Sequence, residues 1–100
     1  MRARARRALT EAIPPDDLDS VVTALRGYAQ RLIPDVERLA HEEPSGSAPR
    51  YAASVCVMTA RDRLRLGNGG TLAVRIAVAQ KLARAVTALC DHYENLGRQA

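Results

Sequence analysis

The 100-residue sequence contains no Phe or Trp and only three Tyr, so its hydrophobic core cannot be built around large aromatic rings. The core must be assembled from Ala, Leu, Val and Ile. Ala and Leu are strong helix formers, and Ala is depleted in strands. The sequence also lacks the aromatic motifs that stack RNA bases. This composition favours an all-α fold.

The sequence also lacks patterns that would indicate disulfide bonds, membrane-spanning segments or a secretory signal. Two cysteines, Cys56 and Cys90, are too few to define a disulfide framework, and both lie in apolar stretches where Cys is a common small core residue. No apolar run is long enough to span a bilayer, and the N-terminal arginines are not followed by the apolar core of a secretory signal. These absences predict a soluble cytoplasmic protein with reduced thiols and no membrane association.

Motifs for catalysis, metal binding and nucleotide binding are missing as well. The segment 67–70 (GNGG) lacks the Lys-Ser/Thr ending of a phosphate-binding loop. Neither zinc-finger spacing nor a histidine pair at i, i+4 occurs, and no short recognition helix is indicated. The sequence therefore predicts no catalytic residue, no metal site and no cofactor.

The charge is unevenly distributed. Four of the fifteen basic residues are Arg2, Arg4, Arg6 and Arg7, and the rest of the chain is neutral despite the net charge of +4. Residues 9–49 carry three basic and eight acidic side chains, whereas residues 50–84 carry seven basic and one acidic. This polarity favours helices that complement one another within the fold or across a dimer. A basic surface for nucleic acid is the less favoured alternative.

Residues 71–97 show the clearest helical pattern in the chain. Two adjacent apolar rows predict a long amphipathic helix with a broad buried face. The first row is Leu72, Ile76, Ala79, Ala83, Val86, Cys90 and Tyr93, and the second is Val78, Leu82, Ala85, Leu89 and Leu96. Thr71 is the expected N-cap.

A second long helix is predicted for residues 17–42. Asp16, Asp17 and Asp19 follow Pro14-Pro15 and suit the positive end of a helix. The apolar rhythm keeps its phase through Pro34, which predicts one helix kinked at that proline; a break at Ile33 is the alternative. The rhythm consists of Leu18, Val22, Leu25, Ala29, Leu32, Val36 and Leu39.

Residues 50–66 are predicted as a shorter middle helix capped by Ser47 and stopped by Gly67. The consecutive apolar residues Val55–Met58 would point all round this helix, so we expect that turn to be covered on every side. The alternation of residues 63–66 and 71–76 across the GNGG segment would also suit a β-hairpin, which we reject because helical rhythm follows.

Together these patterns predict one helical domain over residues 1–100, an antiparallel three-helix bundle with two long helices and a shorter middle one. The basic segment 1–13 is a solvated, fraying stretch, a short helix packed on the bundle, or an anion-binding arm. The middle helix is too short to cover the other two, so the N-terminal segment or a second chain must hide the remaining apolar surface. Together with the apolar turn Val55–Met58, this predicts a homodimer.

Arg75 is the charged exception on the apolar face of residues 71–97. If the two long helices run parallel, Asp17 lies at its level, and an Arg75–Asp17 pair would fix the register. Extension of the arginine to solvent and anion binding are the alternatives. Tyr28, Arg75, His92 and Tyr93 are the candidate binding residues. Residues 91–94 (DHYE) divide between helix faces, so they do not converge on a metal or catalytic site.

Two stretches carry a family resemblance: residues 25–37 (LRGYAQRLIPDVE) and 81–96 (KLARAVTALCDHYENL). They resemble a family of small actinobacterial proteins of unknown function that are associated with natural-product biosynthesis. The resemblance covers most of residues 18–97. It implies a biosynthetic context and supplies no catalytic residues.

The leading functional hypothesis is a non-enzymatic helical accessory protein, dimeric, with a protein partner in specialised metabolism. The second is a small-molecule binder or tailoring enzyme with an interhelical pocket at Tyr28, Arg75, His92 or Tyr93. Nucleic-acid binding through the arginines of residues 2–7 is third.

Overall fold

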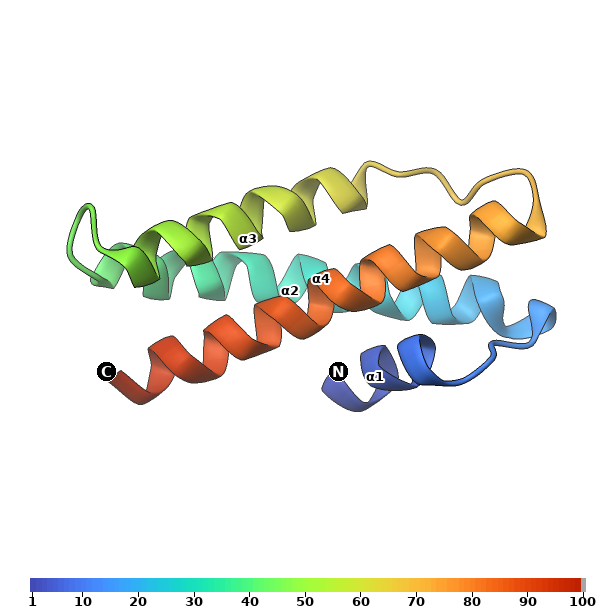
Figure 1. Ribbon diagram of the computed structural model, residues 1–100, viewed down its shortest axis with the longest axis horizontal. Coiled ribbons are helices and arrows are strands. Elements are labelled where there is room, and N and C mark those ends of the chain that lie inside the picture. The colour runs from blue at the N-terminus through green and yellow to red at the C-terminus, as the bar shows by residue number, and fades with distance from the viewer. Residues whose placement is uncertain (100) are drawn as a thin grey trace.

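The computed structural model describes residues 1–99, which contain helices and no strand (Figure 1). The prediction of an all-α fold is confirmed, and the alternative hairpin around residues 67–70 does not form. The helices are α1 (Arg2–Thr10), α2 (Leu18–Glu42), α3 (Ala48–Leu64) and α4 (Leu72–Gln99), with a short 3-10 turn η1 (Pro15–Asp17) before α2.

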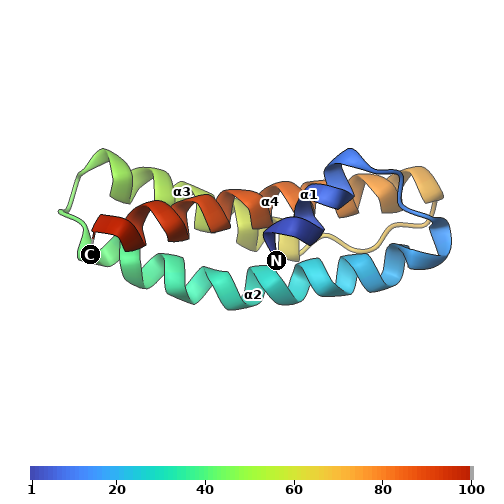
Figure 2. The same ribbon diagram turned by 90° about the horizontal axis from the view of Figure 1, so that it is seen from below.

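The helices lie along one long axis in a body measuring 44 × 23 × 18 Å. In Figures 1 and 2, α2 and α4 run in one direction along this axis, and α1 and α3 run in the other. The helix α4 packs against each of the other three helices, and its most extensive contact is with α2. The helix α1 covers the N-terminal part of α2 and the middle of α4, whereas α3 flanks the same pair on another side.

Of the alternatives for the N-terminal segment, the short helix packed on the bundle is the one that forms, as α1 over residues 2–10. Its buried residues are two alanines, Ala5 and Ala8. Arg2 reaches across to α4, with 2.7 Å between its Nη1 and Asp91 Oδ1 and 2.9 Å between its Nη2 and Glu94 Oε1. The Arg2 guanidinium donates to Asp91 and pairs with Glu94, and these two carboxylates raise its pKa. The two buried alanines, the half-buried Leu9 and the charged contacts of Arg2 therefore hold α1 on the bundle.

Both predicted side-chain caps are present. Ser47 Oγ accepts a hydrogen bond from the Arg50 backbone N–H at 3.3 Å, and Thr71 Oγ1 accepts one from the Val74 N–H at 3.2 Å. Each satisfies one of the N–H groups that an α-helix leaves without an internal partner. The two short polar side chains thus define where α3 and α4 begin.

The helix α2 continues through Pro34, so the alternative break at Ile33 does not occur. Proline removes the hydrogen bond to the carbonyl of Gln30. Both Pro34 and Gln30 are exposed, so water can solvate that carbonyl. Figure 2 shows α2 as one continuous, gently bowed helix. Every residue of its predicted apolar row is buried.

The predicted row on α4 is buried only in its middle. Ala79, Ala83 and Val86 are fully buried, whereas Leu72 is 46% exposed and Tyr93 is 43% exposed. Figure 1 shows that α4 crosses α2 at an angle. The second predicted row of α4 is buried from Val78 to Leu96, so the core side of the helix follows that row rather than Leu72 and Tyr93.

The end of α3 differs from the prediction that Gly67 stops this helix. The helix α3 ends at Leu64, where Arg26 of α2 donates hydrogen bonds to the carbonyls of Leu64 and Leu66 and to Asn68 Oδ1. Gly67 does not adopt a positive φ; Gly69 does, at 84°. A Cβ at Gly69 would lie 2.5 Å from Val74 Cγ1, so glycine is required at that position.

Replacing Arg26 with Met should therefore destabilise the fold. Met keeps most of the aliphatic stem but removes the charged donors, and the helix-end carbonyls lose their partners. We expect the free energy of unfolding in urea to fall by about 2 kcal/mol. Arg31→Met, at an exposed position of the same helix, is the control and should leave stability unchanged. Equal midpoints for the two variants would contradict the capping role.

Replacing Arg2 with Gln should loosen α1 without unfolding the bundle. A helix this short is marginal by itself, so its docking depends on the contacts with Asp91 and Glu94. We expect faster amide hydrogen exchange confined to residues 3–10. Arg6→Gln, an exposed change in the same helix, is the control. Unchanged exchange in the Arg2 variant would show that the apolar contacts of Ala5, Ala8 and Leu9 suffice to hold α1.

Candidate functional site

The four predicted binding residues do not come together. Tyr28 is half-buried against the core of α2. Arg75 lies near the start of α4, and His92 and Tyr93 lie near its C-terminal end. Among the four most pronounced clefts of the described chain, one is lined by a member of this set, His92, beside Pro49 and Leu96. None of these four clefts is lined by two or more of the predicted residues.

Arg75 pairs with a different carboxylate from the one predicted. Its Nη2 lies 3.1 Å from Asp19 Oδ1, whereas Asp17 belongs to η1 and lines a cleft next to α1. The 3-10 turn shifts the helical phase, so Asp19 faces α4 and Asp17 does not. The Asp19 side chain is 79% exposed. The pair therefore lies at the solvent boundary, where such contacts contribute little to stability.

Residues 91–94 divide between faces, as the spacing indicated. Asp91 and Glu94 are one helical turn apart and both hold Arg2, while His92 is half-buried and Tyr93 is exposed. The sequence analysis missed this anchoring role. The available signals in the sequence were the i, i+3 carboxylates Asp91 and Glu94 and the arginine-rich segment 2–7. The sequence did not reveal the path of residues 11–17, which brings that segment against α4.

The cysteines are poor candidates for nucleophiles. Both are free thiols, Cys90 buried and Cys56 half-buried. Burial raises the pKa of each thiol, and the Asp91 carboxylate raises that of Cys56 further. A raised pKa lowers the thiolate fraction at neutral pH, and the thiolate is the reactive form.

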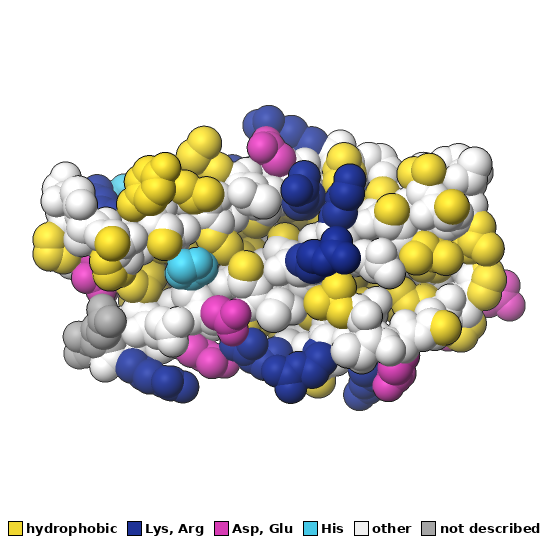
Figure 3. All heavy atoms as spheres, in the orientation of Figure 1, with side chains coloured by type: hydrophobic (Ala, Val, Ile, Leu, Met, Phe, Trp, Pro, Cys, Tyr) yellow, Lys and Arg dark blue, Asp and Glu magenta, His cyan; other side chains and the backbone are white. Residues whose placement is uncertain are grey.

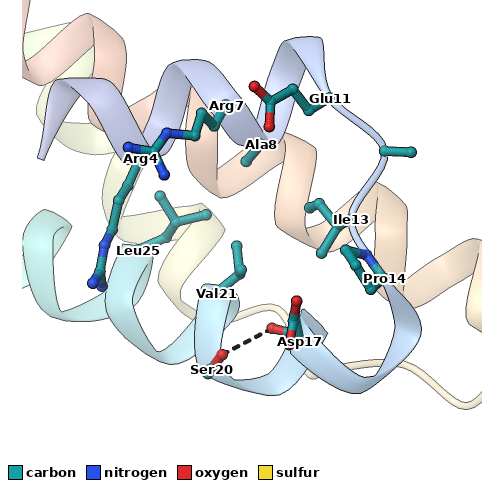
Figure 4. A pocket seen from close by; sticks show the side chains of 11 residues that line it. Arg4, Arg7, Ala8, Glu11, Ile13, Pro14, Asp17, Ser20, Val21 and Leu25 are labelled. Carbon is teal, nitrogen blue, oxygen red and sulfur yellow. Dashed lines mark hydrogen bonds between the residues drawn. The ribbon is translucent and has the colours of Figure 1, made fainter.

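A cleft lies between α1, the link that follows it, and α2 (Figure 4). It has a volume of about 350 Å³, which falls within the range of small-molecule sites. Ala8, Ile13, Val21 and Leu25 contribute apolar surface. Figure 4 shows Arg4, Arg7 and Glu11 on the α1 side of the cleft, with Glu11 one turn beyond Arg7, and Asp17 beside Ser20 on the opposite side.

The outer face of α3 is the most exposed apolar surface on a single helix of the described chain. Tyr51 is 72% exposed, Val55 42% and Met58 64%. We call these three residues the α3 outer stripe. Figure 3 shows apolar side chains gathered over the N-terminal half of α3. The expectation that Val55–Met58 would be covered on every side is wrong for the single chain, because only Val57 of the four is buried.

The inner and outer faces of α3 are both apolar. Ala53, Val57 and Ala60 pack into the bundle, and the α3 outer stripe lies on the opposite side of the helix. Spacings of four and three residues place Tyr51, Val55 and Met58 in one row. Asp62 continues that row by a further four residues. A second apolar face that takes no part in the protein's own core is typical of a binding surface.

Comparison with known proteins places the chain in a family without adding an activity. No curated protein and no solved structure matches it. Within the described residues, each helix is too short or too polar to cross a lipid bilayer. A family model described as a family of unknown function, DUF6415, matches residues 1–98. Since that match covers nearly the whole chain, the protein belongs to this family of unknown function.

Proposed function

We propose that this protein acts by binding rather than by catalysis, as a helical interaction protein that self-associates through the α3 outer stripe. The observation that carries the proposal is the stripe itself. Tyr51 and Met58 are large apolar side chains with most of their surface in water, although the same helix already has a complete inner face. Covering them would gain about 25 cal/mol for each Å² of apolar surface removed from water.

The residues beside the stripe suit close contact with another helix. Ala52, Ser54 and Thr59 are exposed, small and uncharged, so they leave room for a second helix to approach. Charged side chains stand at the edges, where Arg61 pairs with Glu37 of α2. An apolar centre with a charged rim is the common arrangement of protein interfaces.

A second exposed apolar patch suits a different protein partner. Leu72 and Val74, at the start of α4, are 46% and 47% exposed. A groove beside them, formed with Leu66 and Ala77, has a volume of about 550 Å³ and is bordered by Lys81. The family resemblance extends the proposal to an accessory role in actinobacterial natural-product biosynthesis, where this patch would contact a pathway protein. The genes next to this one would test that context.

Replacing Met58 with Glu should break self-association. The new carboxylate would be buried twice in a symmetric contact without a partner, so we expect the dissociation constant to rise by at least about tenfold. Because Met58 is 64% exposed, helix content and thermal stability should not change. Sedimentation velocity over a micromolar concentration series measures the effect.

The control is Gln30→Glu, which adds the same charge to the solvent face of α2 and should leave association unchanged. A wild-type protein that remains monomeric throughout the concentration series would overturn self-association. Dimers that withstand Met58→Glu as well as Gln30→Glu would place the interface away from α3.

A second candidate function, small-molecule binding, is favoured by the cleft between α1 and α2. Its apolar lining suits a hydrocarbon body, and Arg4 and Arg7 suit an anionic group (Figure 4). Glu11 and Asp17 also line the cleft and would repel an anion, so we expect that group to lie against the two arginines. This site shares none of its lining with the four residues predicted from the sequence.

Octanoate and octanol can test the cleft, because they have the same chain length and only octanoate carries a negative charge. We expect octanoate to shift the amide resonances of residues 4–25, and Arg4→Gln combined with Arg7→Gln to weaken its binding by about fivefold or more. Octanol binding should not respond to that double change. Arg6→Gln is the control, because Arg6 lies on α1 outside the cleft lining. Equal octanoate affinity in all variants would remove this candidate.

A further inference from the structure

We infer that two copies of this chain pack α3 against α3 in antiparallel orientation, about a two-fold axis that passes near Val55. This inference rests on the proposed self-association and adds its geometry. In such a pair Tyr51 of one copy lies against Met58 of the other, and each contact occurs twice. An isologous contact of this kind uses the same surface on both subunits and closes at the dimer.

The row of exposed residues is nearly symmetric about its own centre. Tyr51 and Met58 are its two large ends, and Val55 lies close to the midpoint between them. Reversing one copy therefore places the Tyr51 ring over Met58, a favourable sulfur–aromatic contact, at both ends of the stripe. The smaller Val55 side chains meet at the centre. A parallel pair would instead set two tyrosine rings against each other and two methionines against each other.

Charge separates the two orientations further. Asp62 ends the row, and its own partner Arg65 is 3.4 Å away with both side chains largely exposed. In the antiparallel pair, the residue opposite Asp62 is Ser47 or Ala48 at the start of the other α3. The positive dipole end of a helix N-terminus favours a nearby carboxylate. In a parallel pair, Asp62 would face Asp62 beside two negative helix ends.

The size of the contact sets the expected strength. The row from Tyr51 to Asp62 is about 16 Å long at 1.5 Å per residue. One helix against another over that length falls short of the roughly 800 Å² per partner of a standard stable interface. The dimer should therefore be weak and concentration-dependent, in the micromolar range.

Disulfide trapping distinguishes the orientations. Tyr51→Cys and Met58→Cys are made separately in a background carrying Cys56→Ala and Cys90→Ala, each checked for native helix content, and mixed before mild oxidation. We expect the mixed 51–58 disulfide to form well in excess of the 51–51 and 58–58 disulfides. Gln30→Cys in the same background reports random collision. Predominant 51–51 and 58–58 products would overturn the antiparallel orientation while leaving the dimer intact.

Asp62→Asn provides a second measurement that keeps both native cysteines. The antiparallel pair loses two attractive contacts to helix N-termini, so we expect the dissociation constant to rise about threefold or more. Relief of repulsion in a parallel pair would lower the constant instead, and that result would overturn the inference. Sedimentation of the parent protein tests self-association separately from its geometry. Monomer alone would refute the proposed self-association. A dimer that gives no 51–58 disulfide in the trapping experiment would refute only the antiparallel geometry.

Discussion

The aliphatic contact between α2 and α4 is the interaction on which the rest of the structure depends. Three alanines of this contact have no exposed surface: Ala29 on α2, and Ala79 and Ala83 on α4. Buried leucines, rather than aromatic rings, fill the core around them. Small residues at these positions let the two helices approach closely. The helices α1 and α3 then pack on the surface that this pair creates.

Hydrophobic packing has little directional preference, and three arginines add specific contacts between separate elements of the bundle. Arg26 joins α2 to the end of α3, Arg75 joins the starts of α4 and α2, and Arg2 holds α1 against α4. The basic residues that looked like a candidate nucleic-acid surface are thus partly engaged within the fold. Arg2 is the clearest case, since two carboxylates neutralise it.

The helix α3 carries the functional argument because it is apolar on opposite sides. Its inner face completes the bundle, and its outer stripe has no such role within the chain. A symmetric helix pair would use the outer stripe and would leave the cleft beside α1 and the patch at Leu72 and Val74 free for other ligands. Self-association and binding of a further molecule are therefore compatible on this scaffold.

The sequence by itself determined the helices, their caps at Ser47 and Thr71, and the buried row of α2, because these depend on residue spacing and on neighbours within one turn. It also indicated that α3 has apolar residues on more than one side. The tertiary structure alone decided that Arg2 meets Asp91 and Glu94, that Arg75 meets Asp19 rather than Asp17, and that Leu72 and Tyr93 are exposed. These outcomes depend on which side of α4 faces the core and on the path of the links between helices. Two adjacent apolar rows left the first open, and local periodicity contains no information about the second.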